Sequence, residues 1–212
     1  MAERDEVRER TQHILEDLRR GLEFHASSFR EIDEKAKYWL TVGVPSLIGL
    51  SGYAFQKGFS LSPYLLSLII AVVICLFAAV YFFAATIGSS SISAGILLPE
   101  DQKAESCLYY SQSDETWGQY ETLRVGNTLS ALLSNERQNK RKGSRLQVAE
   151  ALLFRGVPTA ACVAASCAAL IDVCVAHGRG IGPTAVIATG IAVGTGTAAA
   201  FWIATHRRTS KA

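Results

Sequence analysis

The sequence predicts an all-α membrane protein, with four transmembrane helices arranged as two hairpins and a cytoplasmic helical bundle. Two observations predict this fold class. Hydrophobic residues make up 49% of the 212-residue chain, and they are concentrated in four blocks with almost all of the charge between them, as in polytopic membrane proteins. The second observation is a heptad-like apolar stripe within a highly charged N-terminal segment, which is typical of a packed helix outside the membrane.

Residues 1–37 are expected to form one long amphipathic helix. Apolar residues recur there at spacings of three and four, and charged residues fill the other positions. No clear stop separates this helix from the first apolar block, so the two are expected to be continuous. The stripe needs a cover, which is either the middle region of the chain or the same helix in another subunit. The stripe consists of Val7, Thr11, Ile14, Leu18, Leu22, His25, Phe29, Ile32 and Ala36.

Each apolar block predicts one membrane-crossing helix. The first is about the minimum length for a span, and Pro45 within it predicts a kink or close helix packing. The second block has no charge and is the clearest of the four. Taken in chain order, the blocks predict two transmembrane hairpins, over residues 38–88 and residues 151–204. The blocks themselves cover residues 38–55, 63–88, 151–177 and 181–204.

The distribution of lysine and arginine predicts the orientation. Residues 1–37 hold eight of them, the middle region (residues 89–150) holds seven and the tail (residues 205–212) holds three, whereas each short turn holds one. Because positive charge is retained on the cytoplasmic side, both termini and the middle region are expected in the cytoplasm. No signal peptide is expected, because the polar start has no short apolar core with a cleavage site.

The middle region is expected to hold one or two helices, preceded by a loop. It is too short for a large core of its own, and packing against the N-terminal helix would cover both. Its basic residues just before the third block have two interpretations. They either set the topology and attract anionic lipid, or they bind a phosphate-bearing ligand whose base stacks on an aromatic ring. The candidate residues are Arg124, Arg137, Lys140, Arg141, Lys142 and Arg145, with Trp117 or Tyr120 for stacking.

A row of small residues in the fourth block predicts close helix packing. Gly190, Gly194 and Ala198 are four residues apart, and Gly182 precedes them. Small residues let helix backbones approach closely in lipid. The row has two readings, packing within one subunit or an interface between subunits.

Two ionisable residues, Arg155 and Asp172, lie inside the third block. Charge within a membrane is costly and often functional, but each lies close to one end of the block. Placement at the membrane boundary is the favoured reading. An aqueous path through an oligomer is the alternative.

Composition and motifs argue against an enzyme and against a metal or cofactor. Hydrolase, phosphate-loop, dinucleotide and zinc-protease signatures are absent. The four histidines are far apart in the sequence, and the five cysteines contain no CxxC pair, so buried free thiols are favoured over disulfides or zinc. The net charge of +2 is too small to favour nucleic acid as a partner.

Several short segments resemble those of bacterial Pycsar-type transmembrane effectors. The segments are IDEKAKYWLTV, ILLPEDQ, CLYYSQSDETWGQYETL and NERQNKRKGSRLQVAEALL. The resemblance covers about residues 25–177, and Asp33, Lys35 and Ala36 match the pattern before the first span. SLATT-type two-span effectors are a second comparison. The glycine-rich fourth block and the tail are not part of the shared pattern.

The resemblance implies an antiphage effector of the bacterial inner membrane. It would respond to a cyclic nucleotide made by a partner cyclase, and would impair the membrane as a homo-oligomer. Asp33, Lys35 and Ala36 would then couple the cytoplasmic helix to the first span. The alternatives are a non-enzymatic membrane scaffold that recruits a cytosolic partner, and a small channel or transporter that uses Asp172.

Overall fold

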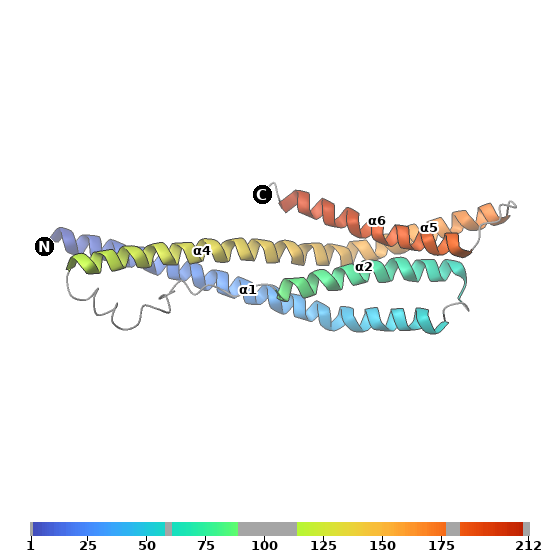
Figure 1. Ribbon diagram of the computed structural model, residues 1–212, viewed down its shortest axis with the longest axis horizontal. Helices are drawn as coiled ribbons and strands as arrows, with labels where there is room; N and C mark the ends of the chain where they lie inside the picture. The colour runs from blue at the N-terminus through green and yellow to red at the C-terminus, as the bar shows by residue number, and fades with distance from the viewer. Residues whose placement is uncertain (1, 58–60, 89–113, 177–182, 210–212) are drawn as a thin grey trace. The chain divides into compact units, whose positions relative to one another are not determined.

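The computed structural model describes residues 2–57, 61–88, 114–176 and 183–209 (Figure 1). These residues are almost entirely helical and contain no strand, which confirms the predicted all-α class. The loop expected at the start of the middle region, the turns and Gly182 lie outside the described residues, so those predictions are untested.

The first helix, α1, runs from Ala2 to Lys57 without interruption. The expected continuity between the charged segment and the first apolar block is therefore confirmed. Pro45 lies inside α1 and does not end it, and the next residue, Ser46, donates its hydroxyl to the carbonyl oxygen of Val42 at 2.8 Å. Serine and threonine hydroxyls commonly bond in this way to the carbonyl four residues earlier in a helix.

The second helix, α2, runs from Pro63 to Ile87. Its start follows from local chemistry. Ser62 precedes the helix and its hydroxyl accepts a hydrogen bond from the backbone N–H of Leu65 at 3.3 Å, while Pro63 occupies the first turn, where no N–H is needed.

The middle region and the third apolar block form one uninterrupted helical run. Helix α4 (Asp114–Ala151) continues into a π-helical segment, η2 (Leu152–Gly156), and then into α5 (Val157–Ala176). In η2 the N–H of Val157 bonds to the carbonyl of Leu152, five residues back. Pro158 offers a physical reason, because a proline has no N–H to donate and its ring crowds the preceding turn. The last helix, α6, spans Pro183–Thr209.

Among the residues that the structure describes, three helical stretches are long and apolar enough to cross a membrane. They are Tyr64–Ile87, an apolar window within Gly118–Ile171, and Thr184–Ala204. Residues 38–55 are helical, as expected, but are not among the three, because glycine, serine, threonine and proline dilute their apolar character. Membrane helices are thus supported, and the fourth span and the two-hairpin topology stay predictions.

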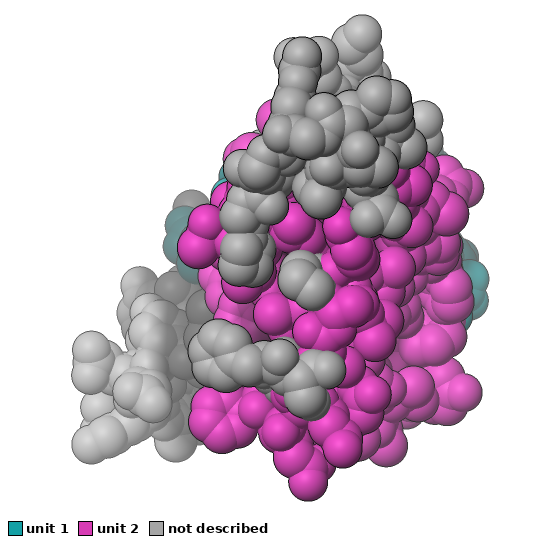
Figure 2. Space-filling view, turned by 90° about the vertical axis from the view of Figure 1, so that its right-hand side faces the viewer, with its two compact units in different colours: residues 1–31, 90–141 teal, residues 32–89, 142–212 magenta. Residues whose placement is uncertain are grey.

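The chain divides into two compact units (Figure 2). Unit 1 contains residues 1–31 and 90–141, and unit 2 contains residues 32–89 and 142–212. These boundaries differ from the domain limits expected from the apolar blocks. Both α1 and α4 contribute residues to each unit.

Within unit 1, α1 packs against α4. A Cβ placed on Gly21 would lie 2.8 Å from a methyl carbon of Leu132, and His25 contacts Asn139. Residue numbers rise together along both helices, so the two run parallel. The middle region therefore supplies the cover that the amphipathic helix was expected to need.

The predicted stripe is correct towards the membrane and wrong in register at its start. Phe29 and Ala36 are buried, whereas Val7 and Ile14 are 60% and 50% exposed and Leu15 is buried instead. Successive spacings of three and four do not fix which of two adjacent apolar residues faces inward. The structure therefore places the packed face one residue away from Ile14.

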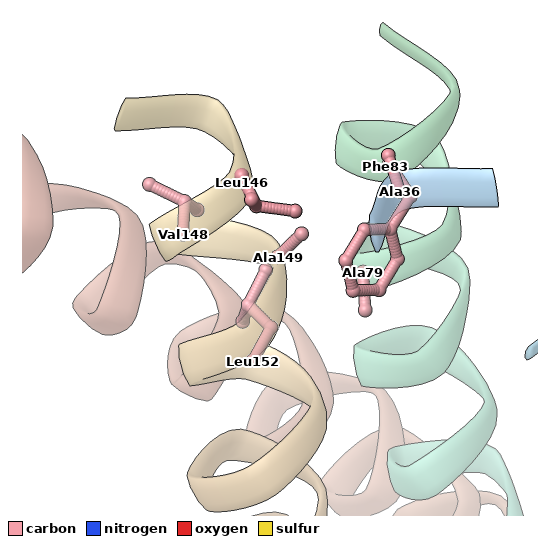
Figure 3. Close-up of a cluster of buried hydrophobic side chains, with 7 residues drawn as sticks. All are labelled: Ala36, Ala79, Phe83, Leu146, Val148, Ala149 and Leu152. Carbon is pink, nitrogen blue, oxygen red and sulfur yellow. The ribbon is translucent and has the colours of Figure 1, made fainter. Parts of the chain in front are cut away.

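Within unit 2, the largest buried cluster joins three helical segments (Figure 3). Phe83 of α2 is directed towards Leu146 and Ala149 of α4, and Ala36 of α1 completes the contact. A second cluster joins Ala71 and Cys75 of α2 to two alanines of α5, Ala160 and Ala164.

Candidate functional site

The candidate site is built around an ion pair between α1 and α4. The ammonium of Lys142 donates a hydrogen bond to Asp33 Oδ1 at 2.8 Å. Only 2% of the Lys142 side chain is exposed, against 24% for Asp33. A buried charge is retained only when it is paired, and Asp33 supplies a carboxylate partner for this lysine.

Burial of this lysine follows from its surroundings. Leu146 lies one turn after Lys142 on α4, Ala36 lies one turn after Asp33 on α1, and both belong to the apolar cluster of unit 2. The aliphatic stem of a lysine packs against such apolar surface while its ammonium reaches a polar partner. The ion pair therefore sits at the polar edge of the core of unit 2.

A second basic residue, Arg145, ties α4 to α2. Its guanidinium donates a hydrogen bond to the carbonyl oxygen of Ala85 at 2.9 Å, within the last turn of α2. Carbonyls in the last turn of a helix have no intrahelical partner and carry partial negative charge. Lys142 and Arg145 together link α4 to both α1 and α2 in unit 2.

The three residues of the expected coupling joint do not share one environment. Asp33 is bonded to Lys142, and Ala36 is completely buried in the apolar cluster. Lys35 is exposed. The two inward-facing residues thus connect α1 to the rest of unit 2.

The structure does not assemble the proposed ligand residues into one pocket within a single chain. Tyr120 and Lys140 lie on the same straight run of α4, and twenty residues of α-helix span about 30 Å. Arg137 and Arg141 are exposed, whereas Lys142 is buried against Asp33. The side chain of Trp117 lies outside the described part of the chain. These candidate residues are therefore spread along α4 rather than gathered at one point of it.

Lys140 forms a surface ion pair with Glu136, which lies one turn earlier on α4. Its ammonium lies 3.0 Å from Glu136 Oε1, with 73% of the lysine side chain exposed. The hydrogen bond and the positive charge from Lys140 lower the pKa of Glu136. Exposed pairs of this kind contribute little to stability.

In unit 1, an amide side chain joins the two helices. Asn139 Nδ2 lies 2.9 Å from the carbonyl oxygen of His25 and 3.1 Å from His25 Nδ1. The carbonyl can only accept, so it fixes the NH₂ group of the amide towards α1, and Nδ1 must accept the second hydrogen bond. The sequence did not reveal Asn139, because a single asparagine in a basic run has no recognisable pattern.

The small-residue row of α6 packs against α2 of the same chain. A Cβ placed on Gly190 would lie 2.5 Å from the carbonyl oxygen of Ser67, and one on Gly194 would lie 3.0 Å from the carbonyl oxygen of Ala71. Cys75 Sγ lies 3.5 Å from the Gly194 carbonyl oxygen, and Ala198 packs against the larger apolar cluster. This is packing within one subunit.

The partner row on α2 went unnoticed in the sequence, although a signal exists. Ser67, Ala71, Cys75 and Ala79 recur every four residues and are all buried. Small residues at this spacing on two helices are the pattern expected for close approach in lipid. The uniformly apolar composition of α2 obscured the row.

Of the two ionisable residues in the third block, the structure describes the surroundings of the Arg155 side chain only. Arg155 is exposed and belongs to η2, near the start of the block. Asp172 lies on α5, but its side chain is outside the part of the structure that is described. No group of three or more potential metal ligands occurs among the described residues.

No protein-family model, curated protein or solved structure matches the chain.

Proposed function

We propose that this protein is a membrane effector in which a signal received by cytoplasmic helices alters the packing of membrane helices. The observation that carries the proposal is the buried Lys142–Asp33 pair, which binds α4 to α1 at the polar edge of the core of unit 2. Breaking or re-forming such a pair changes local stability by several kcal/mol, enough to bias two arrangements of packed helices.

Helix continuity supports transmission of the signal. Both α1 and α4 run without a break from unit 1 into unit 2. A continuous helix moves as a rigid element, so a rotation or shift of the cytoplasmic part reaches the apolar part. The ion pair lies where both helices have just entered unit 2, with Lys142 its first residue on α4.

The membrane arrangement proposed here keeps four spans, with both termini in the cytoplasm. Residues 38–55 are the added span. Their large apolar residues are exposed in the chain, with Ile48 at 65% and Phe55 at 93%, and such a surface is stable against lipid rather than water. The lysine and arginine distribution supports the orientation.

The defence role and the ligand rest on the sequence resemblance. The signal would be a cyclic nucleotide made by a partner cyclase, and the target would be the bacterial inner membrane. Because a single chain does not bring the candidate ligand residues together, a nucleotide site would have to be shared between subunits. Leu129 and Leu133 support association, since they lie one turn apart on α4 and are 44% and 47% exposed.

Induced expression in bacteria tests the proposal. Cells that produce the protein and are supplied with candidate cyclic nucleotides should lose membrane potential, read with a voltage-sensitive dye, and should stop growing. Asp33→Ala should prevent this loss while the protein still inserts in the membrane. Normal potential under every candidate nucleotide, with correctly inserted protein, would contradict the proposal.

A scaffold that recruits a cytosolic partner is the second candidate function. The same exposed leucines favour it, because an apolar strip on a polar helix can bind another protein. Purification of a stoichiometric cytosolic partner that is lost in Leu129→Lys, together with unchanged membrane potential in producing cells, would favour the scaffold over the effector.

A further inference from the structure

Unit 2 contains a half-open cleft of about 420 Å³. The end of α4 and the π-helical segment η2 form one wall, and the last turns of the apolar part of α6 form the other. A cleft of this volume accommodates a small organic ligand. Its lining includes Glu150, Phe154, Arg155, Phe201 and Ala204.

The cleft lies at the end of a membrane-compatible segment. Ala204 is the last residue of the apolar stretch Thr184–Ala204, and it lines the cleft. The ends of membrane-spanning helices lie at the depth of the lipid head groups. Lipid head groups are therefore present at a high local concentration at this cleft.

The lining carries opposite charges beside aromatic rings. Glu150 contributes a carboxylate and Arg155 a guanidinium, and no ion pair joins either of them to another residue in the described part of the chain. Phe154 and Phe201 supply the apolar surface, with Phe154 55% exposed. A ligand with a phosphate, an ammonium and an apolar tail would match all three features.

The π-helical segment explains how both charges reach one cleft. In a regular α-helix, residues five apart point roughly 140° away from each other. The hydrogen bonds of η2 span five residues, and such a widened turn brings residues five apart closer to one face. Glu150 and Arg155, which are five apart, both line the cleft.

We propose that this cleft binds the head group of a zwitterionic phospholipid that carries a primary ammonium. The Arg155 guanidinium binds the phosphate, which suits its planar set of donors. Glu150 accepts from the ammonium, and the two phenylalanine rings contact the glycerol and the first acyl carbons. The inference does not depend on the proposed effector function.

Lipid retention measured by native mass spectrometry tests the proposal. The full-length protein is purified in detergent and mixed with phosphatidylethanolamine or with phosphatidylglycerol of the same acyl chains. The wild type should retain the first at least tenfold more strongly. Glu150→Gln should lose this discrimination while still retaining both lipids, and Arg155→Met should retain neither. Arg30→Met, at an exposed arginine of α1, is the matched control and should behave as the wild type.

Water-soluble competitors test whether the cleft prefers the phosphate of a lipid head group to that of a free phosphate compound. Excess phosphoethanolamine should displace the bound lipid only partly, because it lacks the acyl carbons that the phenylalanine rings contact, and inorganic phosphate should displace less. Equal retention of the two lipids by the wild type would overturn the proposal. So would unchanged discrimination in Glu150→Gln, or a loss of lipid retention in Arg30→Met equal to that in Arg155→Met. Each variant is first required to elute as the wild type does in gel filtration.

Discussion

Lys142 and Asp33, which are 109 residues apart in the sequence, form an ion pair of 2.8 Å with only 2% of the lysine side chain exposed. One residue was expected to bind a ligand and the other to act as a joint between helices. Their contact brings these two candidate residues together. In this arrangement the ammonium of Lys142 is engaged by the carboxylate, so an incoming anion would first have to displace Asp33.

The first prediction concerns the stability of this pair. Asp33→Ala leaves a buried ammonium without its carboxylate, and such a loss costs about 3–5 kcal/mol. The double variant Asp33→Leu with Lys142→Met should recover most of this loss, because apolar residues of similar volume replace a buried pair at little cost. Thermal unfolding in detergent measures the effect.

Glu34→Ala is the matched control for this measurement. Glu34 is the next residue on α1 and is exposed, so its loss should leave the unfolding temperature within experimental error. If Asp33→Ala and Glu34→Ala unfolded at the same temperature, the pair would have no structural role.

Local signals predicted much of the secondary structure. The uninterrupted α1 followed from apolar spacing and from the absence of a stop, and the second apolar block, expected over residues 63–88, begins where α2 begins. Capping and periodicity act over a few residues, so a sequence displays them directly. The π-helical segment also had a local cause, Pro158, but proline more often kinks a helix than widens it.

Tertiary relationships could not be read in the same way. The parallel pairing of α1 with α4 and the Lys142–Asp33 contact join residues more than a hundred positions apart. Nothing in the local spacing of Asp33 separates it from its exposed neighbour Glu34. Which of them turns inward depends on the register of α1 against α4, and this register is set by packing rather than by propensity.

The second prediction tests the contact between α6 and α2. Gly190→Ala places a Cβ 2.5 Å from the backbone carbonyl oxygen of Ser67, so the helices must separate, at a cost of about 1–3 kcal/mol. Gly196→Ala is the control on the same helix, because no atom lies within 4 Å of its added Cβ. It should raise stability by about 0.5–1 kcal/mol through helix propensity. Thermal unfolding of both variants in one detergent would show opposite signs, and equal shifts would contradict the contact.

The third prediction concerns Arg145 and the end of α2. Arg145→Met removes the hydrogen bond to the Ala85 carbonyl oxygen, and a hydrogen bond to a charged group contributes about 1.5–3 kcal/mol. Amide hydrogen exchange should therefore accelerate in the last turn of α2, with little change at its first turn. Arg141→Met should not accelerate it, since Arg141 is exposed. Uniform acceleration along α2 would indicate general destabilisation instead.

The fourth prediction tests the orientation of the Asn139 amide. Asn139→Asp replaces the NH₂ group with an oxygen that faces the His25 carbonyl at 2.9 Å, where both atoms are acceptors. The aspartate variant should therefore be less stable at neutral pH than Asn139→Ala, which merely removes the contact at a cost of about 1–2 kcal/mol. Chemical denaturation in detergent compares the two. A more stable aspartate variant would mean that the amide is oriented the other way.

The last prediction separates stability from signalling. If the Lys142–Asp33 pair only holds the helices together, the apolar double variant Asp33→Leu with Lys142→Met should be both stable and active. If the pair must both break and re-form for the signal to pass, as the proposed function has it, the double variant should unfold like the wild type yet leave the membrane potential unchanged in signalled cells. An apolar contact has no ionic partner for an anion to displace, so it removes the switch while it keeps the packing. Voltage-dye fluorescence and thermal unfolding of the same variant give the answer, and a fully active double variant would remove the ion pair from the mechanism.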